Sequence, residues 1–125
     1  MNDETIDYDG LLQANLSRVF SEGDRDRRRA AIAEIYAPDA ILYEPGNIAT
    51  GHGEIAAAVD ALLESLPPEF VFTAVGPGVG HHGVGRLRWR SGRPGEPPAV
   101  TGMDVVRFDA GQIKTIHVFL DPAAP

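Results

Sequence analysis

The chain has 125 residues, of which 43% are hydrophobic and 23% are charged, a balance typical of one globular domain that can hold a core and a pocket. The formal net charge of −7 disfavours nucleic acid and anionic membranes as partners, and the absence of cysteine excludes disulfides, thiolate metal ligands and thiol nucleophiles. No apolar run is long enough to span a membrane, and the acidic first residues do not resemble a signal peptide, so we expect a cytoplasmic protein.

We expect a single domain over residues 1–125, with roughly eight residues at the N-terminus and about four at the C-terminus flexible. Three helices are predicted at residues 9–21, 25–36 and 54–65, because apolar side chains recur there at helical spacing. Asp24 is placed to cap the second helix, and a pair of prolines ends the third.

The rest of the pattern predicts strands. Pro38-Asp39 is expected to end the second helix, and residues 40–44 to form a short strand that stops at Pro45-Gly46. Four further strands are predicted at residues 70–79, 82–90, 99–108 and 112–120. Consecutive strands joined by short loops pair antiparallel. This order predicts an α+β fold, in which a strongly curved antiparallel sheet wraps around three helices and leaves a cone-shaped pocket.

One carboxylate, Asp104, lies in the middle of the apolar strand at 99–108. Period-two alternation puts Asp104 on the same face as Gly102, Val106 and Phe108, so an inward orientation would bury it among hydrocarbon. A buried acid must be paired, kept protonated or used in chemistry. Asp104 is therefore a candidate general acid or hydrogen-bond donor. The alternative is a structural carboxylate, either paired with an arginine of the neighbouring strand or hydrogen-bonded to the backbone of a helix.

The orientation of the preceding predicted strand, residues 82–90, decides whether an arginine can pair with Asp104. Leu87 and Trp89 share one face, whereas Arg86 and Arg88 lie on the other. We expect Leu87 and Trp89 to point inward. The reversed register would bring an arginine into the pocket beside Asp104 and would favour a hydrolase or dehydratase that uses arginine or histidine.

Metal and cofactor chemistry has no matching motif. The four histidines show none of the spacings typical of metal ligands, and the glycines of residues 76–81 lack the Lys-Ser/Thr ending of a phosphate loop. We therefore expect no metal site and no cofactor. The basic run at residues 25–29 is interrupted by an acid and is interpreted as the solvated face of a helix.

Two stretches of sequence carry a family resemblance. The first is Tyr36-Ala-Pro-Asp-Ala-Ile-Leu-Tyr-Glu-Pro45 followed by Gly51-His-Gly-Glu-Ile55, and the second is Gly102-Met-Asp-Val-Val-Arg-Phe-Asp-Ala-Gly-Gln-Ile113 followed by Val118-Phe-Leu-Asp121. Together with the element order, from about residue 9 to 121, they resemble the nuclear-transport-factor-2-like superfamily, in particular its SnoaL-like and ketosteroid-isomerase-like branch.

The resemblance implies roles for two acids. Glu44 matches the branch's proton-shuttling carboxylate, although the family residue is an aspartate, and Asp104 matches its protonated, hydrogen-bond-donating aspartate. The position of the branch's oxyanion tyrosine falls near Leu16, so this chain lacks that tyrosine. The resemblance also implies a homodimer formed through the outer face of the sheet, at Met103, Val105 and Phe119.

These observations predict a domain that takes up a small, largely apolar organic molecule. If catalytic, it would be a cofactor-free isomerase or cyclase, with Glu44 as base and Asp104 as donor. The alternative is a non-catalytic ligand-binding or dimerisation module. The expected apolar lining of the pocket is Leu16, Leu42, Leu62, Phe72, Trp89, Val106, Val118 and Leu120.

Overall fold

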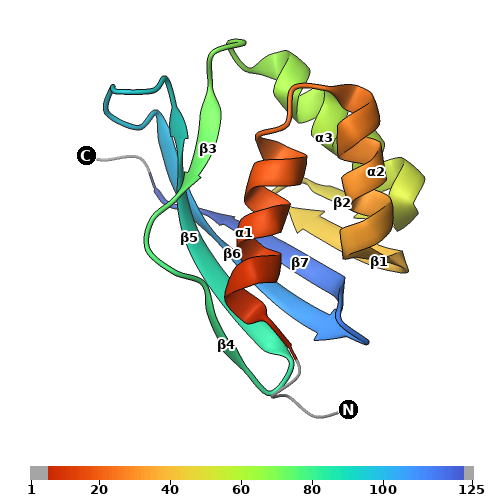
Figure 1. Ribbon diagram of the computed structural model, residues 1–125. Helices are drawn as coiled ribbons and strands as arrows, with labels where there is room; N and C mark the ends of the chain where they lie inside the picture. The colour runs from red at the N-terminus through yellow and green to blue at the C-terminus, as the bar shows by residue number, and fades with distance from the viewer. Residues whose placement is uncertain (1–5, 123–125) are drawn as a thin grey trace.

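A computed structural model describes residues 6–122 and confirms the α+β class. Figure 1 shows the helices gathered on one face of a sheet that curves around them without closing. The helical elements are α1 (Tyr8–Asn15), η2 (Leu16–Phe20), α2 (Arg25–Ile35) and α3 (Gly51–Ser65). The strands are β1 (Tyr36–Glu44), β2 (Asn47–Thr50), β3 (Val71–Ala74), β4 (Val79–His81), β5 (Val84–Gly92), β6 (Val100–Asp109) and β7 (Gln112–Leu120).

The strand order is β2-β1-β7-β6-β5-β3, and β4 also pairs with β5. The predicted antiparallel pairing of β5, β6 and β7 is confirmed, whereas β1 joins the sheet parallel to β7. The β6–β7 hairpin turns at Ala110 and Gly111, both at positive φ, as a two-residue turn of this hand requires.

Besides small shifts at the ends of β5 and β6, three features of the strands differ from the prediction. Strand β1 begins at Tyr36, because Pro38 is tolerated where the register between β1 and β7 shifts. Strand β2 was not predicted; it forms a hairpin with β1 across Gly46, which has a φ of +84°. The strand expected at 70–79 is divided into β3 and β4 near Gly76, a bend of the kind that glycine allows.

Helix starts and ends follow local chemistry. The carboxylate of Asp7 accepts a hydrogen bond from the Gly10 amide and caps α1, and that of Asp24 accepts one from the Arg27 amide and caps α2 as predicted. The first helix leaves α-geometry at Leu16 and continues as the single π-turn η2. The Ser21 hydroxyl then exchanges two hydrogen bonds with the backbone of Phe72, which ties the helix end to β3.

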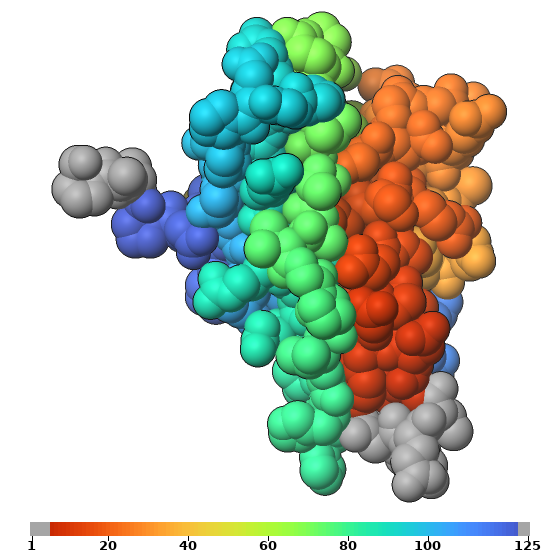
Figure 2. Space-filling model, turned by 60° about the vertical axis from the view of Figure 1, so that its left-hand side comes forward, coloured from red at the N-terminus to blue at the C-terminus, as the bar shows by residue number. Residues whose placement is uncertain are grey.

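Helix α1 lies along β4 and β5, and Figure 2 shows it directly beside the segment that contains β3 and β4. The Tyr8 ring packs edge-on against Phe108, with centroids 5.5 Å apart, and its hydroxyl accepts a hydrogen bond from the Gly83 amide. Of the terminal residues expected to be flexible, Asp7 and Tyr8 thus form the start of α1, and residues 1–5 and 123–125 lie outside the described part.

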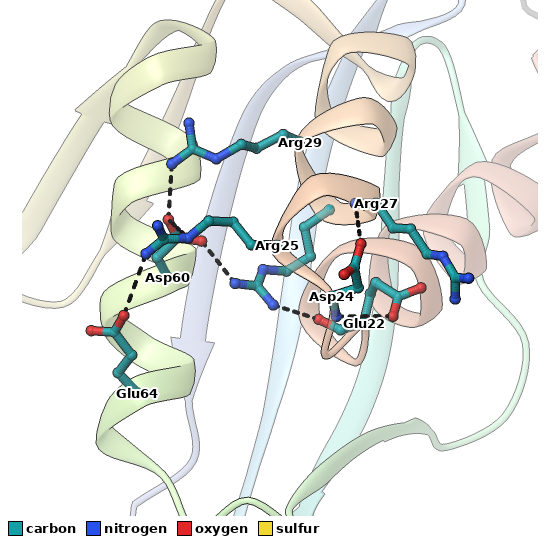
Figure 3. A network of polar contacts seen from close by, with 8 residues as sticks. Glu22, Asp24, Arg25, Arg27, Arg29, Asp60 and Glu64 are labelled. Carbon is teal, nitrogen blue, oxygen red and sulfur yellow. Dashed lines mark hydrogen bonds and ion pairs between the residues drawn. The ribbon is translucent and has the colours of Figure 1, made fainter.

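The basic run on α2 corrects the expectation of a solvated face. Arg28 is buried, and its guanidinium donates to Asp60 of α3 at 2.8 Å and to the Glu22 carbonyl at 2.7 Å. Arg25 and Arg29 reach the other oxygen of the same carboxylate, as Figure 3 shows. Asp60 therefore joins α2 to α3 through three arginines. None of the helices within residues 6–122 has the length and apolar character needed to cross a membrane.

Candidate functional site

A cavity of about 450 Å³ lies between the helices and one end of the sheet. Its wall is mostly apolar, and both candidate acids, Asp104 and Glu44, border it. Six of the eight apolar residues expected in the lining are present: Leu16, Leu62, Phe72, Trp89, Val118 and Leu120. The sequence did not indicate further lining residues on η2, α3 and the loops, among them Phe20, Ala58, Leu66 and Phe70.

Leu42 and Val106 do not line the cavity, in contrast to the expectation. Both are completely buried in the hydrophobic core. The cavity occupies the end of the sheet that contains the last residues of β1, β5 and β7 and the first residues of β6. Leu42 and Val106 share the inward face of their strands with Glu44 and Asp104, but each lies two residues further from the cavity end of its strand and packs within the hydrophobic core.

Asp104 points inward, as the alternation along its strand predicts, and is only 3% exposed. Its Oδ1 accepts a hydrogen bond of 2.9 Å from the indole Nε1 of Trp89. Within residues 6–122 no salt bridge involves Asp104, because Arg86 and Arg88 lie exposed on the other face of β5. The arginine-paired alternative and the reversed register are therefore wrong.

The environment of Asp104 determines its protonation. Burial raises the pKa of the Asp104 carboxyl to about 7, and the hydrogen bond from Trp89 opposes part of that rise. Because the indole N–H already occupies Oδ1, the proton of the neutral acid belongs on Oδ2. Near neutral pH this side chain is thus divided between a neutral donor and a carboxylate.

Trp89 reaches Asp104 because of the residue opposite it. Trp89 pairs with Gly102 across β5 and β6, so the indole lies over a position without a side chain. A Cβ at position 102 would come within 2.5 Å of the ring. The ring also packs edge-on against Phe72, with centroids 5.4 Å apart. Gly102 and Phe72 therefore hold the indole where its N–H meets the carboxylate.

Glu44 is half-buried at the end of β1, where the Asn47 amide nitrogen lies 3.5 Å from its Oε1. Tyr43 pairs with His117, and Asp104 pairs with Val118, so one strand, β7, separates the two acids. At the usual spacing of strands, their backbones are about 10 Å apart. A small molecule in the cavity can lie between them.

A buried polar pair deeper in the fold was not predicted. The Tyr36 hydroxyl donates a 2.6 Å hydrogen bond to Oδ1 of Asn15. Burial, together with the nearby charge of Asp104, raises the pKa of the Tyr36 hydroxyl above its ordinary value, so it stays neutral. The helical spacing of Asn15 with Leu12 and Val19 could have indicated that it faces inward. Because Tyr36 is engaged with Asn15 and does not border the cavity, it does not replace the missing oxyanion tyrosine.

The histidines lie away from the cavity. His117 is on the outer face of β7, stacked between Tyr43 at 4.4 Å and Phe119 at 6.4 Å. His81 and His82 contact each other in an exposed turn. Within the described ranges, no three His, Asp or Glu side chains converge as metal ligands would.

The sequence pattern that defines the SnoaL-like domain family matches residues 14–116, which is most of the chain. The protein belongs to the SnoaL-like family. This confirms the resemblance drawn from the two sequence stretches. No curated protein sequence matches the chain.

Three solved structures are similar to this chain over most of their length. A candidate isomerase of this family from Agrobacterium tumefaciens is 28% identical, with a TM-score of 0.84, and the match covers 92% of this chain and 97% of that one. A candidate polyketide cyclase from Sinorhizobium meliloti is 19% identical, with a TM-score of 0.69 and coverages of 87% and 93%. A candidate ketosteroid isomerase from Kribbella flavida is 12% identical, with a TM-score of 0.71 and coverages of 94% and 80%. The latter two likenesses concern the fold alone.

Proposed function

We propose that this SnoaL-like protein binds a small, largely apolar ketone and moves a proton next to its carbonyl group, as a cofactor-free isomerase or cyclase. The observation that supports this most directly is Asp104, an acid that borders an apolar cavity and has no cationic partner among the described residues. A neutral carboxylic acid in such a place donates a strong hydrogen bond to an oxygen that becomes negative. The description of the Agrobacterium relative as a candidate isomerase agrees with this class of chemistry.

The proposed reaction begins at a carbon beside the carbonyl. The Glu44 carboxylate takes a proton from that carbon, and the electron pair moves onto the carbonyl oxygen to form an enolate. Asp104 donates its Oδ2–H to this oxygen while Trp89 holds Oδ1. In an isomerase, Glu44 returns the proton to another carbon of the conjugated enolate. In a cyclase, the enolate carbon attacks a second carbonyl of the same molecule.

Isomerisation of cyclohex-3-en-1-one to its conjugated isomer tests the proposal through the rise in ultraviolet absorbance. Glu44→Gln should lower kcat/KM by at least about 100-fold, because the base is lost. The wild-type kcat/KM should fall as the pH rises above about 7, since Asp104 then loses the proton that it donates. Asp104→Asn should be about tenfold slower at low pH, because an amide is a weaker donor, and should lose that decline above pH 7.

Two exposed carboxylates serve as controls. Asp109 lies on the same strand as Asp104 but outside the cavity, and Glu96 lies in the loop before β6. The control variants are Asp109→Asn and Glu96→Gln. Both should retain the wild-type rate and pH profile. A carbon-detected NMR titration of Asp104 with a midpoint near 4, or full activity in Glu44→Gln and Asp104→Asn, would contradict the proposal.

We also propose that two copies associate through the outer face of the sheet. Phe119 is 55% exposed there and continues the aromatic stack of Tyr43 and His117. Exposed apolar side chains of this size favour burial against a partner. Light scattering should show a dimer for the wild type and a monomer for Phe119→Glu. Ala30→Glu, at an exposed alanine of α2 on the helical side of the sheet, should remain dimeric. A wild-type monomer at high concentration would contradict this association.

A further inference from the structure

Ser91, near the end of β5, has a buried hydroxyl that the fold does not use. The residue is 3% exposed, and its backbone is fully engaged, since it pairs with Phe72 and Val100 and its carbonyl accepts from the Ala99 amide at 2.8 Å. The hydroxyl oxygen has no hydrogen-bond partner among residues 6–122. A buried hydroxyl without a partner destabilises a protein, and alanine, which lacks only that oxygen, would avoid this cost.

The position of Ser91 distinguishes it from the other buried polar atoms without a partner. In the part of the chain that the structure describes, those atoms are Asn15 Nδ2 and Arg28 Nε, and neither residue borders the cavity that Asp104 lines. Ser91 does border it. In the present rotamer Oγ itself has almost no exposed surface, so it meets a ligand in the cavity only after rotation about the single Cα–Cβ bond. The hydroxyl can then both donate and accept a hydrogen bond.

Ser91 and Asp104 lie at separate places along the cavity. Asp104 pairs with Leu87, and Ser91 follows Leu87 by four residues on the same strand. At the rise of an extended strand this separates the two positions by about 13 Å. The wall between them is the indole of Trp89, with Phe72 beside it. Along β5 and β6 the cavity wall therefore presents Asp104, then an apolar stretch, then Ser91, while Glu44 and Asn47 line it at the β1–β2 hairpin.

We infer that the ligand is an elongated apolar molecule with two oxygen functions, a ketone bound at Asp104 and a hydroxyl or second carbonyl bound at Ser91. This inference rests on the proposed function and adds the class of substrate to it. Glu44 lies across β7 from Asp104, so the reacting carbonyl belongs at that end and Ser91 holds the remote end. Ser91 thereby sets how far the molecule enters and which carbon faces the base.

Two probes that differ by one hydroxyl test this inference. The first is 4-acetyl-4′-hydroxybiphenyl, which has a ketone and a hydroxyl at opposite ends, and the second is 4-acetylbiphenyl, which lacks the hydroxyl. Trp89 is the only tryptophan, so its fluorescence reports binding in the cavity. The wild type should bind the hydroxylated probe about threefold to tenfold more tightly, as one added hydrogen bond allows. Ser91→Ala should bind the two probes alike.

The matched control is Ser17→Ala, at an exposed serine of η2, which should retain the preference of the wild type. Ser91→Ala should also raise Tm by a few degrees without ligand, because it removes an unsatisfied buried hydroxyl. A lower Tm would mean that the hydroxyl has a structural partner and would overturn the inference. So would equal affinity of the wild type for both probes, with the proposed function left standing. Failure of the wild type to bind either probe would overturn both.

Discussion

Replacing Asp104 with asparagine should stabilise the protein by about 4 kcal/mol above pH 7, and should have little effect near pH 4. The folded-state pKa is about 7, against an ordinary value of 3.8, and each unit of difference corresponds to about 1.4 kcal/mol. An uncharged amide of the same shape avoids burial of the charge, while its oxygen still accepts the hydrogen bond from Trp89.

The pH dependence of this effect has a definite sign. Below the unfolded pKa, both states of the wild type hold the proton on Asp104. Between about 4 and 7, the unfolded chain releases it while the folded protein keeps it, so stability falls as the pH rises. Above the folded-state pKa, Asp104 is ionised in both the folded and the unfolded state, and stability no longer falls with pH. In Asp104→Asn, residue 104 does not titrate, so it should cause no decrease of stability with pH.

Urea unfolding of the wild type and Asp104→Asn at several pH values between 4 and 8 measures the difference. Asp109→Asn, exposed on the same strand, should follow the wild type throughout. A variant less stable than the wild type at pH 8 would mean that the carboxylate is a favourable structural group. An acid that lowers stability at neutral pH is instead typical of a functional position.

The inward face of the strand that bears Asp104 could be predicted, because alternation with period two depends only on the order of residues. Its hydrogen bond with Trp89 could not. That contact needs the register of β5 against β6 and the empty space over Gly102, both of which involve residues distant in the chain. The same register excluded the arginines that the sequence left as alternatives.

The sequence could not predict how far the cavity extends along the strands, for a similar reason. Leu42 and Glu44 share a face, as do Val106 and Asp104, so alternation cannot separate core from cavity wall along one strand. The difference arises from how far the helices fill the curve of the sheet. Ser91 was also missed, because the predicted strand ended at residue 90 and β5 continues to Gly92, which carries Ser91 into the buried face.

The basic run on α2 shows that ion pairs between elements are equally hard to predict from the sequence. Spacing along one helix predicted solvated arginines, but the partner of Arg28 is Asp60, on another helix. The two buried acids therefore have opposite surroundings. Asp60 faces three arginines, and the hydrogen bond from Arg28 is the largest cause of a pKa below its usual range. Asp104 forms no ion pair with any residue that the structure describes, and its pKa is raised by burial. The first is a structural link between helices, and the second is the candidate for chemistry.

Asp60→Asn should accordingly destabilise the protein, by roughly 3 kcal/mol at pH 7, since it leaves the buried Arg28 without its counter-charge. Because the folded pKa of Asp60 is lowered, its contribution is present above about pH 4 and is lost as the pH falls through the folded value. Urea unfolding at pH 7 and near pH 3 should show this difference shrink in acid, the reverse of the trend at Asp104. Glu64→Gln, which removes only the exposed pair with Arg25, should change stability by less than about 1 kcal/mol. Equal stability of Asp60→Asn and Glu64→Gln would show that the arginine cluster does not hold α2 to α3.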